Sequence, residues 1–599
     1  MPEEISPQKF QNVVHQGFNR MKHYRKMRAL FVKEYVGQYY RSKGVTLSGD
    51  EPINLIFQAI RTIVPNLAVT NPVNSVSTRF LPQKPYAELL SLALNQIQED
   101  MKLKDIIRAC IVDAMFGFGI LKTGIAASGE LLQFGDNLID PGQVYTELID
   151  LDDFVFDPVC TSMRKSAFMG HRVTIPKQIL LDTKGYNHDL IKKIPRLGYP
   201  QEKIERLTKD KGMSYDMESL QDLINVVELW VPEAEAVVTI PDPLQITFTE
   251  HLRIADYYGP KEGPYTILSF TPPVPGNPFP VAPVGMLFDL HRGANKAFKK
   301  IMDQAGRQRD ITFYTPAAAD EAEALRESQD GDLIATMNPN EVKTVSFGGQ
   351  NKDNALYLQQ MQIWFNYFAG NPDQMAGNMT PGTKGGKTTA TQSQIMQGNA
   401  SIGIEDGRGI LYDKTSDVSK KHAWYLHTDP MIELPLIKRR SGGEQIQLWL
   451  TPEQRSGDFL HFTFKIRQRS MTRLNPDVRA KRIVEFGTNL VPALINAGMV
   501  AVQSGMQFNV TRAVTQLAEQ LDILEDVQDW FDDPEFEQKM MMMMQKGPQN
   551  AGKASMSPEG TLQNGGFPQQ TNIPTSGQIF NQEAQATAAE GQKVNQGAY

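Results

Sequence analysis

The chain has very little cysteine and no apolar run long enough to cross a membrane. Its 599 residues include only two cysteines, Cys110 and Cys160. Two cysteines cannot form a disulfide framework, and no Cys-x-x-Cys pair or Cys/His cluster indicates zinc, so the sequence favours a reducing compartment. Every apolar run is shorter than the roughly 20 residues that a spanning helix needs. The first residues lack a basic segment followed by an apolar run, so we expect no secretory signal.

Signature motifs of enzymes are scarce as well. The sequence contains no Gly-x-Ser-x-Gly, His-Glu-x-x-His or Gly-x-Gly-x-x-Gly motif. The segment 382–388 is similar to a phosphate-binding P-loop, but Pro381 stands where the first glycine is required, and the preceding pattern is helical instead of a strand. We interpret it as a flexible glycine-rich loop that carries two cations. We expect no enzymatic activity and no cofactor, although catalytic residues can assemble from distant parts of a chain.

Clusters of metal-ligating residues are equally rare. Four acidic residues that could bind a hard cation stand close together, at Asp150, Asp152, Asp153 and Asp157. They lack the glycine and the spacing of an EF-hand loop, and the alternation of Phe154 and Phe156 before Pro158 fits a strand end and a turn better. The nine histidines are scattered, and His422 and His427 are five residues apart, a poor spacing for one helix face. We therefore expect no metal site.

What the chain does have is the composition of an ordinary globular protein. Its residues are 41% hydrophobic and 22% charged, with a formal net charge of −7. The length corresponds to roughly three to five structural units. Because the chain is acidic overall, any contact with nucleic acid would have to come from a local basic patch or from a channel that does not hold phosphates tightly.

Helices are predicted throughout the first part of the chain. Apolar residues recur at helical spacing over 8–43, 54–64 and 87–118, the second of these stopped by Pro65, and a strand is predicted over 120–125. The polar side of the first helix is rich in cations: Lys22, Arg25, Lys26, Arg28 and Lys33. That side is either a solvated face or a surface for an acidic partner.

From 120 to 280 short β-like runs alternate with turns, and helical insertions are predicted within 177–222, so this part is expected to be α+β. Strands are predicted at 143–149, 154–156, 168–173, 225–230, 236–240 and 266–270. A proline-dense stretch at 272–280 marks a boundary.

A helix, a small insert and a second helix follow this boundary. The first helix, 284–307, would be roughly 35 Å long, and its polar side carries Arg292, Lys296, Lys299 and Lys300. The insert, 310–348, is predicted as strands at 311–314, 333–336 and 342–347 and a helix at 317–328. The second helix, 354–368, has one stripe: Leu356, Gln360, Ile363, Trp364, Tyr367 and Phe368.

A long loop, 370–387, comes next, with five glycines and the two cations Lys384 and Lys387. Such a loop inside a compact region tends to be functional or mobile. A helix is predicted over 389–427, bent by glycines at 398, 403, 407 and 409. Strands follow within 432–467 and helices within 475–545. The last stretch, 546–599, is rich in polar residues, glycine and proline, which predicts disorder.

This order of elements resembles that of the portal, or head-to-tail connector, proteins of tailed bacteriophages. The resemblance covers about 8–545 and rests on the conjunction of several stretches, since no single motif is diagnostic. These stretches are Tyr35 to Tyr40, Pro52 to Asn54, Val64-Pro65, Asp113 to Gly124, Leu151 to Phe154 with Asp157-Pro158, and Thr388 to Met396.

The resemblance implies an α+β, mainly helical portal-like fold that assembles as a ring. It divides the chain into a wing at 1–283, a first stem helix at 284–309, a clip at 310–350, a second stem helix at 351–370, a tunnel loop at 371–388, a long kinked helix with wing strands at 389–470, a helical crown at 471–545 and a disordered tail at 546–599. The run Met540–Met544 near the end of the crown departs from the family.

The resemblance also implies a function without catalysis. A dodecameric ring would form the DNA channel at one capsid vertex of the virion, after assembly in the host cytoplasm. Its partners would be double-stranded viral DNA, the large terminase subunit, a head-completion or tail adaptor protein, and the major capsid and scaffolding proteins, with no membrane. Lys384 and Lys387 of the tunnel loop would contact DNA phosphates transiently. Two cations suit a channel through which DNA must slide, because many phosphate contacts would hold the DNA in place.

Two other readings of the sequence stay open. A nucleotide-dependent DNA motor or nuclease would need a nucleotide or metal site near 382–388 or 150–157. Another virion component, such as a capsid protein or a tail hub, is the second. A capsid protein would be expected to be shorter and to lack the helix–insert–helix–loop order of 284–388, and a tail hub would form a smaller ring.

Overall fold

The computed structural model describes residues 6–37, 53–68, 70–126, 132–134, 137–139, 144–196, 222–272, 274–329, 333, 335, 342–349, 352–370, 390–430, 432–439, 445–466, 471, 476–503, 513–514 and 516–518. The chain divides into two compact units, 1–533 and 534–599, and all described residues belong to the first. This unit mixes helices and strands and is mainly helical, which confirms the predicted α+β class.

The amino-terminal helix begins where the sequence predicts and ends earlier. Helix α1 (Pro7–Val36) is followed by Gly37, whose φ of 65° lies in the left-handed region that favours glycine. The rest of the predicted range, 38–43, lies outside the described residues. Val14, Phe18 and Met21 on the inner side of α1 are buried, so α1 covers the cores of the strands that follow.

Two predictions for the next helices were wrong in detail. Helix α2 (Leu55–Leu67) continues past Pro65, because a proline this near the end removes one hydrogen bond while Val64 and Leu67 stay buried. The single helix expected over 87–118 is two helices, α3 (Lys84–Asp100) and α4 (Leu103–Met115). The two helices are separated at Lys102, whose left-handed φ of 51° interrupts the helical backbone. Apolar residues continue at helical spacing across this interruption, which explains why the sequence predicted a single helix.

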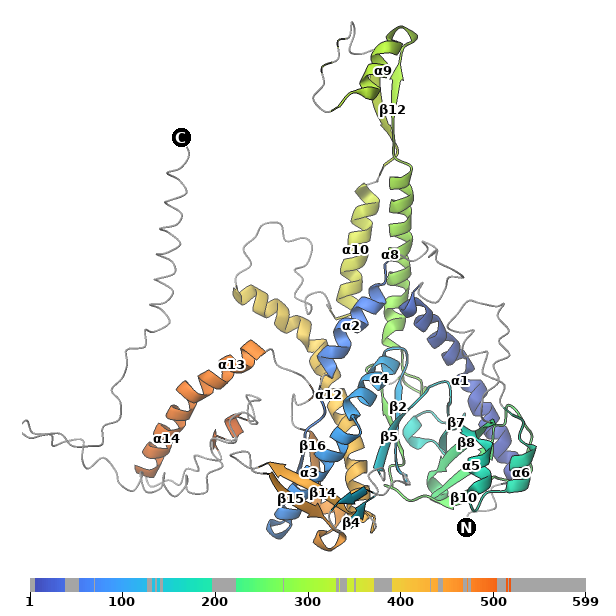
Figure 1. Cartoon of the computed structure of the whole chain (residues 1–599), viewed down its shortest axis with the longest axis vertical. Coiled ribbons are helices and arrows are strands. Elements are labelled where there is room, and N and C mark those ends of the chain that lie inside the picture. Colours follow the sequence, from blue (N-terminus) through green and yellow to red (C-terminus); the bar gives the residue numbers. More distant parts are fainter. Residues whose placement is uncertain are drawn as a thin grey trace, which may run out of the picture. The chain divides into compact units, whose positions relative to one another are not determined.

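Two antiparallel sheets form the α+β part, with every strand but β10 close to a predicted position (Figure 1). The larger sheet has the order β10-β9-β8-β7-β6, with β6 (Phe154–Phe156), β7 (Met169–Pro176), β8 (Leu223–Val231), β9 (Ala236–Pro241) and β10 (Arg253–Asp256). The smaller sheet has the order β11-β2-β5, with β2 (Gly119–Ile125), β5 (Val144–Ile149) and β11 (Tyr265–Leu268). A hairpin, β3 (Leu132–Phe134) and β4 (Asn137–Ile139), lies between β2 and β5 in the chain.

Short helices and apolar side chains complete the larger sheet. Helices α5 (Lys177–Asp182) and α6 (His188–Lys193) occupy part of the predicted insertion, and 197–221 lies outside the described residues. Strand β8 buries seven of its nine residues, as a central strand packed on both faces does. The hydrophobic core of this sheet includes Val14 and Phe18 of α1, so α1 and the sheet share one core.

The helix–insert–helix segment has the expected order. Helix α8 (Pro283–Gly306) leads into the hairpin strand β12 (Arg309–Tyr314), then helix α9 (Ala319–Glu327), the second hairpin strand β13 (Val342–Phe347) and helix α10 (Lys352–Phe368). Strands β12 and β13 pair antiparallel, with Ile311 opposite Val345. Of the strand predicted at 333–336, the described residues Leu333 and Ala335 are not in a strand.

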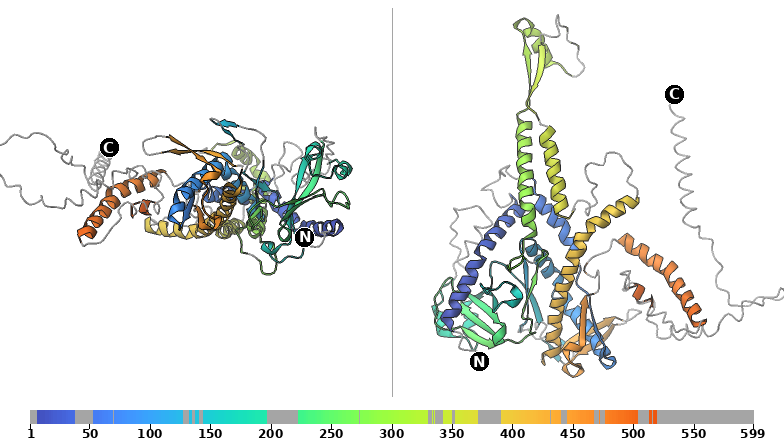
Figure 2. Two further views of the ribbon diagram at one scale, coloured as in Figure 1. Left: turned by 90° about the horizontal axis from the view of Figure 1, so that it is seen from below. Right: turned by 180° about the vertical axis from the view of Figure 1, so that it is seen from behind.

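The long helix α12 (Ala390–Thr428) runs without interruption through the four glycines that were predicted to bend it. Figures 1 and 2 both show its axis changing direction along its length. At Gly407 a side chain would begin 3.3 Å from Leu67, so this glycine allows α12 to approach α2 closely. The predicted bend is therefore present, and one of its glycines also serves packing.

Three further strands follow α12, as predicted. They are β14 (Leu434–Arg439), β15 (Gln445–Leu450) and β16 (Phe462–Ile466). Strand β16 pairs with β1 (Asn74–Thr78), which the sequence did not predict, because β1 is polar and its partner is almost 400 residues away. This pairing joins an early part of the described chain to a late one.

Helices close the described part of the chain. These are α13 (Pro476–Glu485), a π-helical turn (Phe486–Leu490) and α14 (Val491–Gln503). They agree with the helices predicted from 475 onwards. The run Met540–Met544 and the tail 546–599 lie outside the described residues.

One arginine fastens α1 to two other elements. Arg28 donates to Asp113 of α4 at 2.9 Å and to Asp150 at 3.0 Å, and Asp152 lies 3.8 Å away. Burial lowers the pKa of Arg28, but the three carboxylates raise it further, so that the net shift is upward. Burial raises the pKa of Asp113, and Arg28 offsets part of that rise. The group therefore works as an ion-paired unit that orders the helix and the β5–β6 turn.

Replacing Arg28 by alanine should destabilise the protein by about 3 kcal/mol, because three clustered carboxylates would lose their common partner. The free energy of unfolding, measured by denaturant titration, checks this value. Arg164→Ala, at an exposed position, is the matched control and should change it by less than about 0.5 kcal/mol. Equal effects of the two substitutions would show that the ion pairs do not hold α1.

Candidate functional site: the α8–α10 segment

Helices α8 and α10 lie side by side along much of their length (Figures 1 and 2). A side chain at Gly293 of α8 would begin 3.7 Å from the sulfur of Met361, so this glycine faces α10. Closer to the hairpin, Asn354 donates to Gln304 at 3.0 Å. The two helices are thus joined at the hairpin end and along their shared face.

The start of α8 is fixed in the body of the unit. Its buried residues Val284 and Leu287 belong to the core that also contains Ile60 of α2 and Leu411 of α12. About two turns later, the Asn295 amide bonds both backbone groups of Ile53, accepting at 3.1 Å and donating at 2.9 Å. The Asn295 amide thus provides hydrogen-bond partners for the N–H and the C=O of Ile53, which would cost free energy if they were buried without partners. Apolar packing and the Asn295 hydrogen bonds therefore hold the first part of α8 in the body of the unit.

The outer face of α10 is apolar and uncovered within the described residues. Only Met361 and Phe365 of this helix are buried. Six other large side chains of this helix are exposed by large fractions: Leu356 63%, Tyr357 52%, Ile363 39%, Trp364 44%, Tyr367 70% and Phe368 56%. Five of these six form the stripe that the sequence predicts, together with the exposed Gln360. The apolar face identified by periodicity is thus the face that the chain itself leaves open.

Apolar exposure continues into the insert between the two helices. Strand β12 exposes Ile311, Phe313 and Tyr314 by 43%, 52% and 54%, and Leu325 of α9 is 42% exposed. A two-stranded sheet with one short helix has few places to bury such residues. Exposed apolar side chains gathered on one segment are typical of an interaction surface.

The four cations predicted on α8 are all on its exposed side. Arg292, Lys296, Lys299 and Lys300 are exposed, and the guanidinium of Arg292 lies 5.4 Å from the centre of the Phe288 ring. Their spacing of three and four residues places them on one face. Exposed Asp289 and Asp303 share this face, so it is basic but not uniformly so. The structure thus brings these four residues together, whereas Lys384 and Lys387 lie outside the described residues.

The acidic cluster proposed from sequence turns out to bind arginines. Asp150 and Asp152 lie at Arg28, while Asp153 is 3.7 Å from Arg172. Asp157 accepts from the backbone N–H of Val159 at 3.0 Å, as expected for a turn. Within the described ranges no group of three or more His, Cys, Asp or Glu residues could hold a metal ion. The P-loop-like segment 382–388 is outside those ranges.

The two histidines of α12 have separate partners. Nε2 of His422 lies 2.7 Å from the Thr146 hydroxyl, and its Nδ1 lies 3.3 Å from the amide of Gln98. Burial lowers the pKa of His422 to about 3, so it is neutral at physiological pH. His427 instead bonds the Tyr86 hydroxyl at 2.9 Å. The two rings therefore belong to the packing of α12 against α3 and β5.

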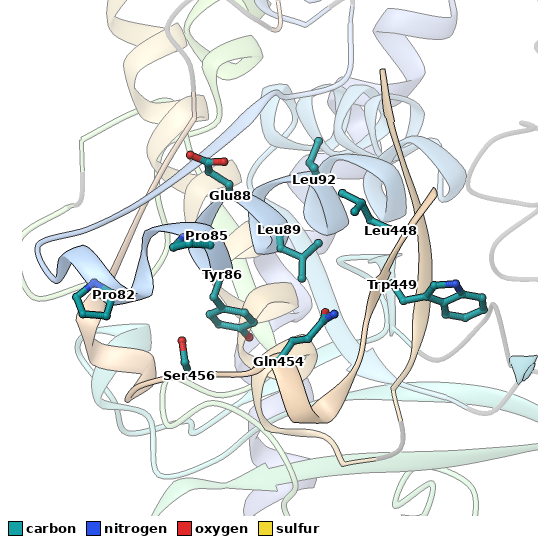
Figure 3. A pocket seen from close by; sticks show the side chains of 10 residues that line it. All are labelled: Pro82, Pro85, Tyr86, Glu88, Leu89, Leu92, Leu448, Trp449, Gln454 and Ser456. Carbon is teal, nitrogen blue, oxygen red and sulfur yellow. The ribbon is translucent and has the colours of Figure 1, made fainter. Parts of the chain in front are cut away.

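One shallow pocket, of about 440 Å³, lies between the start of α3 and the strand β15 (Figure 3). Its lining residues are Pro82, Pro85, Tyr86, Glu88, Leu89, Leu92, Leu448, Trp449, Gln454 and Ser456. Glu88 is its one carboxylate, with no histidine, cysteine or lysine beside it. Residues more than 350 positions apart form it, so sequence reasoning had no signal for it. It contains none of the predicted site residues and no pair of groups suited to acid–base catalysis.

A buried lysine fixes α12 to the smaller sheet. The amine of Lys421 donates to the carbonyl of Tyr265 at 2.7 Å and to the hydroxyl of Thr266 at 2.9 Å. Burial lowers its pKa to about 7, an effect that Asp417 and Glu262 offset in part. A charged amine in this position costs stability, because the unfolded chain would hold the same proton in water.

The pH dependence of stability should reveal this lysine. With a folded pKa of about 7 and an unfolded value near 10.4, the unfolded state binds more protons between these values, so stability rises with pH there. Relative to Lys421→Met, the parent should gain about 2 kcal/mol between pH 7 and pH 9. Thermal unfolding at both pH values measures this gain. Lys165→Met, at an exposed position away from Lys421, should leave the pH dependence as in the parent. An identical pH dependence in Lys421→Met and in the parent would contradict the assignment.

None of the helices in the described part of the chain is both long and apolar enough to span a bilayer. No protein-family model matches this sequence, and a search of curated proteins also finds no match. The geometry of the α8–α10 segment is therefore what bears on function.

Proposed function

We propose that this chain is the subunit of a portal ring, the connector at one capsid vertex through which double-stranded viral DNA is packaged and ejected. In this proposal α8 and α10 are the stem helices, the β12–α9–β13 insert is the clip, and α12 is the long helix after the tunnel loop. The order of these elements along the chain supports the proposal, as does the resemblance carried by the sequence.

The observation that carries the proposal is the open apolar face of α10. Six large side chains of α10 are at least 39% exposed in the single chain, although Met361 and Phe365 of the same helix are buried. A ring supplies a neighbour for such a face in every subunit, because a heterologous contact that closes on itself leaves no subunit without a partner. The exposed residues of β12 and α9 would be covered in the same way or by a docking protein.

The charges fit a channel that lets DNA pass. The chain is acidic overall, while the basic face of α8 is local. Phosphate contacts bind DNA more tightly as their number rises, so a channel for translocation is better served by few cations than by many. Arg292, Lys296, Lys299 and Lys300 would supply such a limited set, together with Lys384 and Lys387 of the loop.

The proposed partners follow from the resemblance. They are a dodecameric set of identical chains, the large terminase subunit that supplies ATP hydrolysis, a head-completion or tail adaptor protein, and the major capsid and scaffolding proteins. In this proposal the chain itself is not an enzyme and needs no cofactor. Its place is the portal vertex of the virion.

Introducing charge on the open face of α10 tests the ring. Trp364→Asp with Tyr367→Asp should abolish or strongly reduce assembly, because two carboxylates would be desolvated at the subunit contact. Native mass spectrometry of the full-length protein measures the subunit number. Leu460→Asp, at a residue that is 83% exposed on a different element, is the matched control and should assemble as the parent does. A parent protein that remains monomeric at micromolar concentration would refute the proposal.

The loop cations provide a second test of the same proposal. Lys384→Ala with Lys387→Ala should alter DNA packaging or the retention of packaged DNA, because each lysine removed takes away one phosphate contact. Packaged genome length and its loss on storage are the quantities to measure. Lys192→Ala with Lys193→Ala, on the exposed side of α6, serves as control. Packaging and retention at parental levels in the loop variant would remove these two residues from the DNA path.

A further inference from the structure

Helix α1 carries many cations and almost no compensating acid. Its thirty residues include seven lysines and arginines, and the acidic residue among them is Glu34. Glu34 is buried and lies 3.7 Å from the ring of His291 on α8. It therefore does not balance the charges on the outer side of α1.

Three of the arginines face inward and have partners. Arg20 donates to the carbonyls of Pro158 and Cys160, Arg25 donates to the carbonyl of Phe154 at 2.7 Å, and Arg28 is ion-paired as described above. These contacts hold α1 on the sheet. Lys22 and Lys26, on the outward side of α1, take no part in these contacts.

The outward side of α1 is a basic stripe. Asn19, Lys22, His23 and Lys26 are exposed and stand three and four residues apart, so they share one face. Among the described residues no carboxylate lies within ion-pair distance of Lys22 or Lys26. Lysines at this spacing repel each other weakly, and Leu30 adds an apolar residue, 46% exposed, at the end of the stripe. An acidic segment with apolar residues would complement this face.

A segment with that composition follows residue 518. Another acidic segment, 145–163, already has Asp150 and Asp152 at Arg28 and Asp153 at Arg172. Residues 519–533 lie outside the described part and contain no lysine, arginine or histidine. Their acidic residues are Glu519, Asp522, Glu525, Asp526, Asp529, Asp532 and Asp533. Leucines and aromatic residues stand between these acids. By contrast, the acidic helix α9 also contains Arg326, and its charge is partly balanced already.

We propose that the outward face of α1, formed by Asn19, Lys22, His23 and Lys26, binds the acidic segment 519–533 of this chain. The attraction is between opposite charges at the protein surface, so it weakens as salt screens them. The proposal goes beyond the portal assignment and does not depend on it, because the charges of α1 and of 519–533 are the same whatever function this chain has.

Zero-length crosslinking of the full-length protein with a carbodiimide tests the contact. We expect amide crosslinks from Lys22 or Lys26 to carboxylates of 519–533 at low salt, identified by mass spectrometry, and fewer of them at high salt. The surface ion pair between Lys420 and Glu262, with 2.7 Å between Nζ and Oε1, is the internal control. If the control crosslink forms and Lys22 and Lys26 give none to 519–533, the proposal is wrong.

Charge reversal provides the second measurement. In Lys22→Glu with Lys26→Glu, backbone amides of 519–533 should exchange hydrogen about threefold faster or more, as expected when two surface ion pairs are lost. Lys192→Glu with Lys193→Glu on α6 makes the same charge change elsewhere and should leave the exchange unchanged. Adding Asp522→Lys with Asp529→Lys to the α1 variant should restore slow exchange. Equal exchange in the parent and the α1 variant would overturn the proposal, as would an equal effect of the α6 control.

Discussion

Two packed helices can cover only one face of each other, and this constraint shapes the whole α8–α10 segment. Met361 and Phe365 occupy the shared face of α10, which leaves its other apolar side chains to be covered from outside the chain. An amphipathic helix gains most of its stability in a protein from packing its apolar face. Because the described chain has no further element over this face, assembly with other subunits is the simplest way to bury it.

The body of the unit is built to hold that segment in place. Asn295 fixes the base of α8 to the segment before α2, Arg28 fixes α1 to α4 and to the β5–β6 turn, and Lys421 fixes α12 to β11. Each of these polar groups is largely buried and has hydrogen-bonding partners, which lowers the cost of burying it. A rigid body with an open helix face suits a part that must meet identical neighbours in one geometry.

Regular periodicity made the middle of the chain predictable. Helices α8 and α10 and the hairpin strands β12 and β13 agree with the sequence within a few residues, because local patterns specify them. The break at Lys102 was missed because the apolar pattern continues through it. Strand β1 was missed because its five residues, all polar except Val76, become a strand only through pairing with β16. The partners of the acidic cluster were equally hidden, since Arg28 is about 120 residues from Asp150. Periodicity identified the stripe on α10 but could not say what covers it.

The central claim is that identical chains close into a ring around a channel. Single-particle electron microscopy of the purified full-length protein tests this claim most directly, because it counts the subunits and shows the opening. We expect a closed ring of about twelve chains, consistent with heterologous contacts that close on themselves, with α10 covered by the neighbouring subunit and a channel wide enough for a B-form double helix. A monomer, a dimer or a closed particle without a channel would contradict the account and return attention to the glycine-rich loop around Lys387.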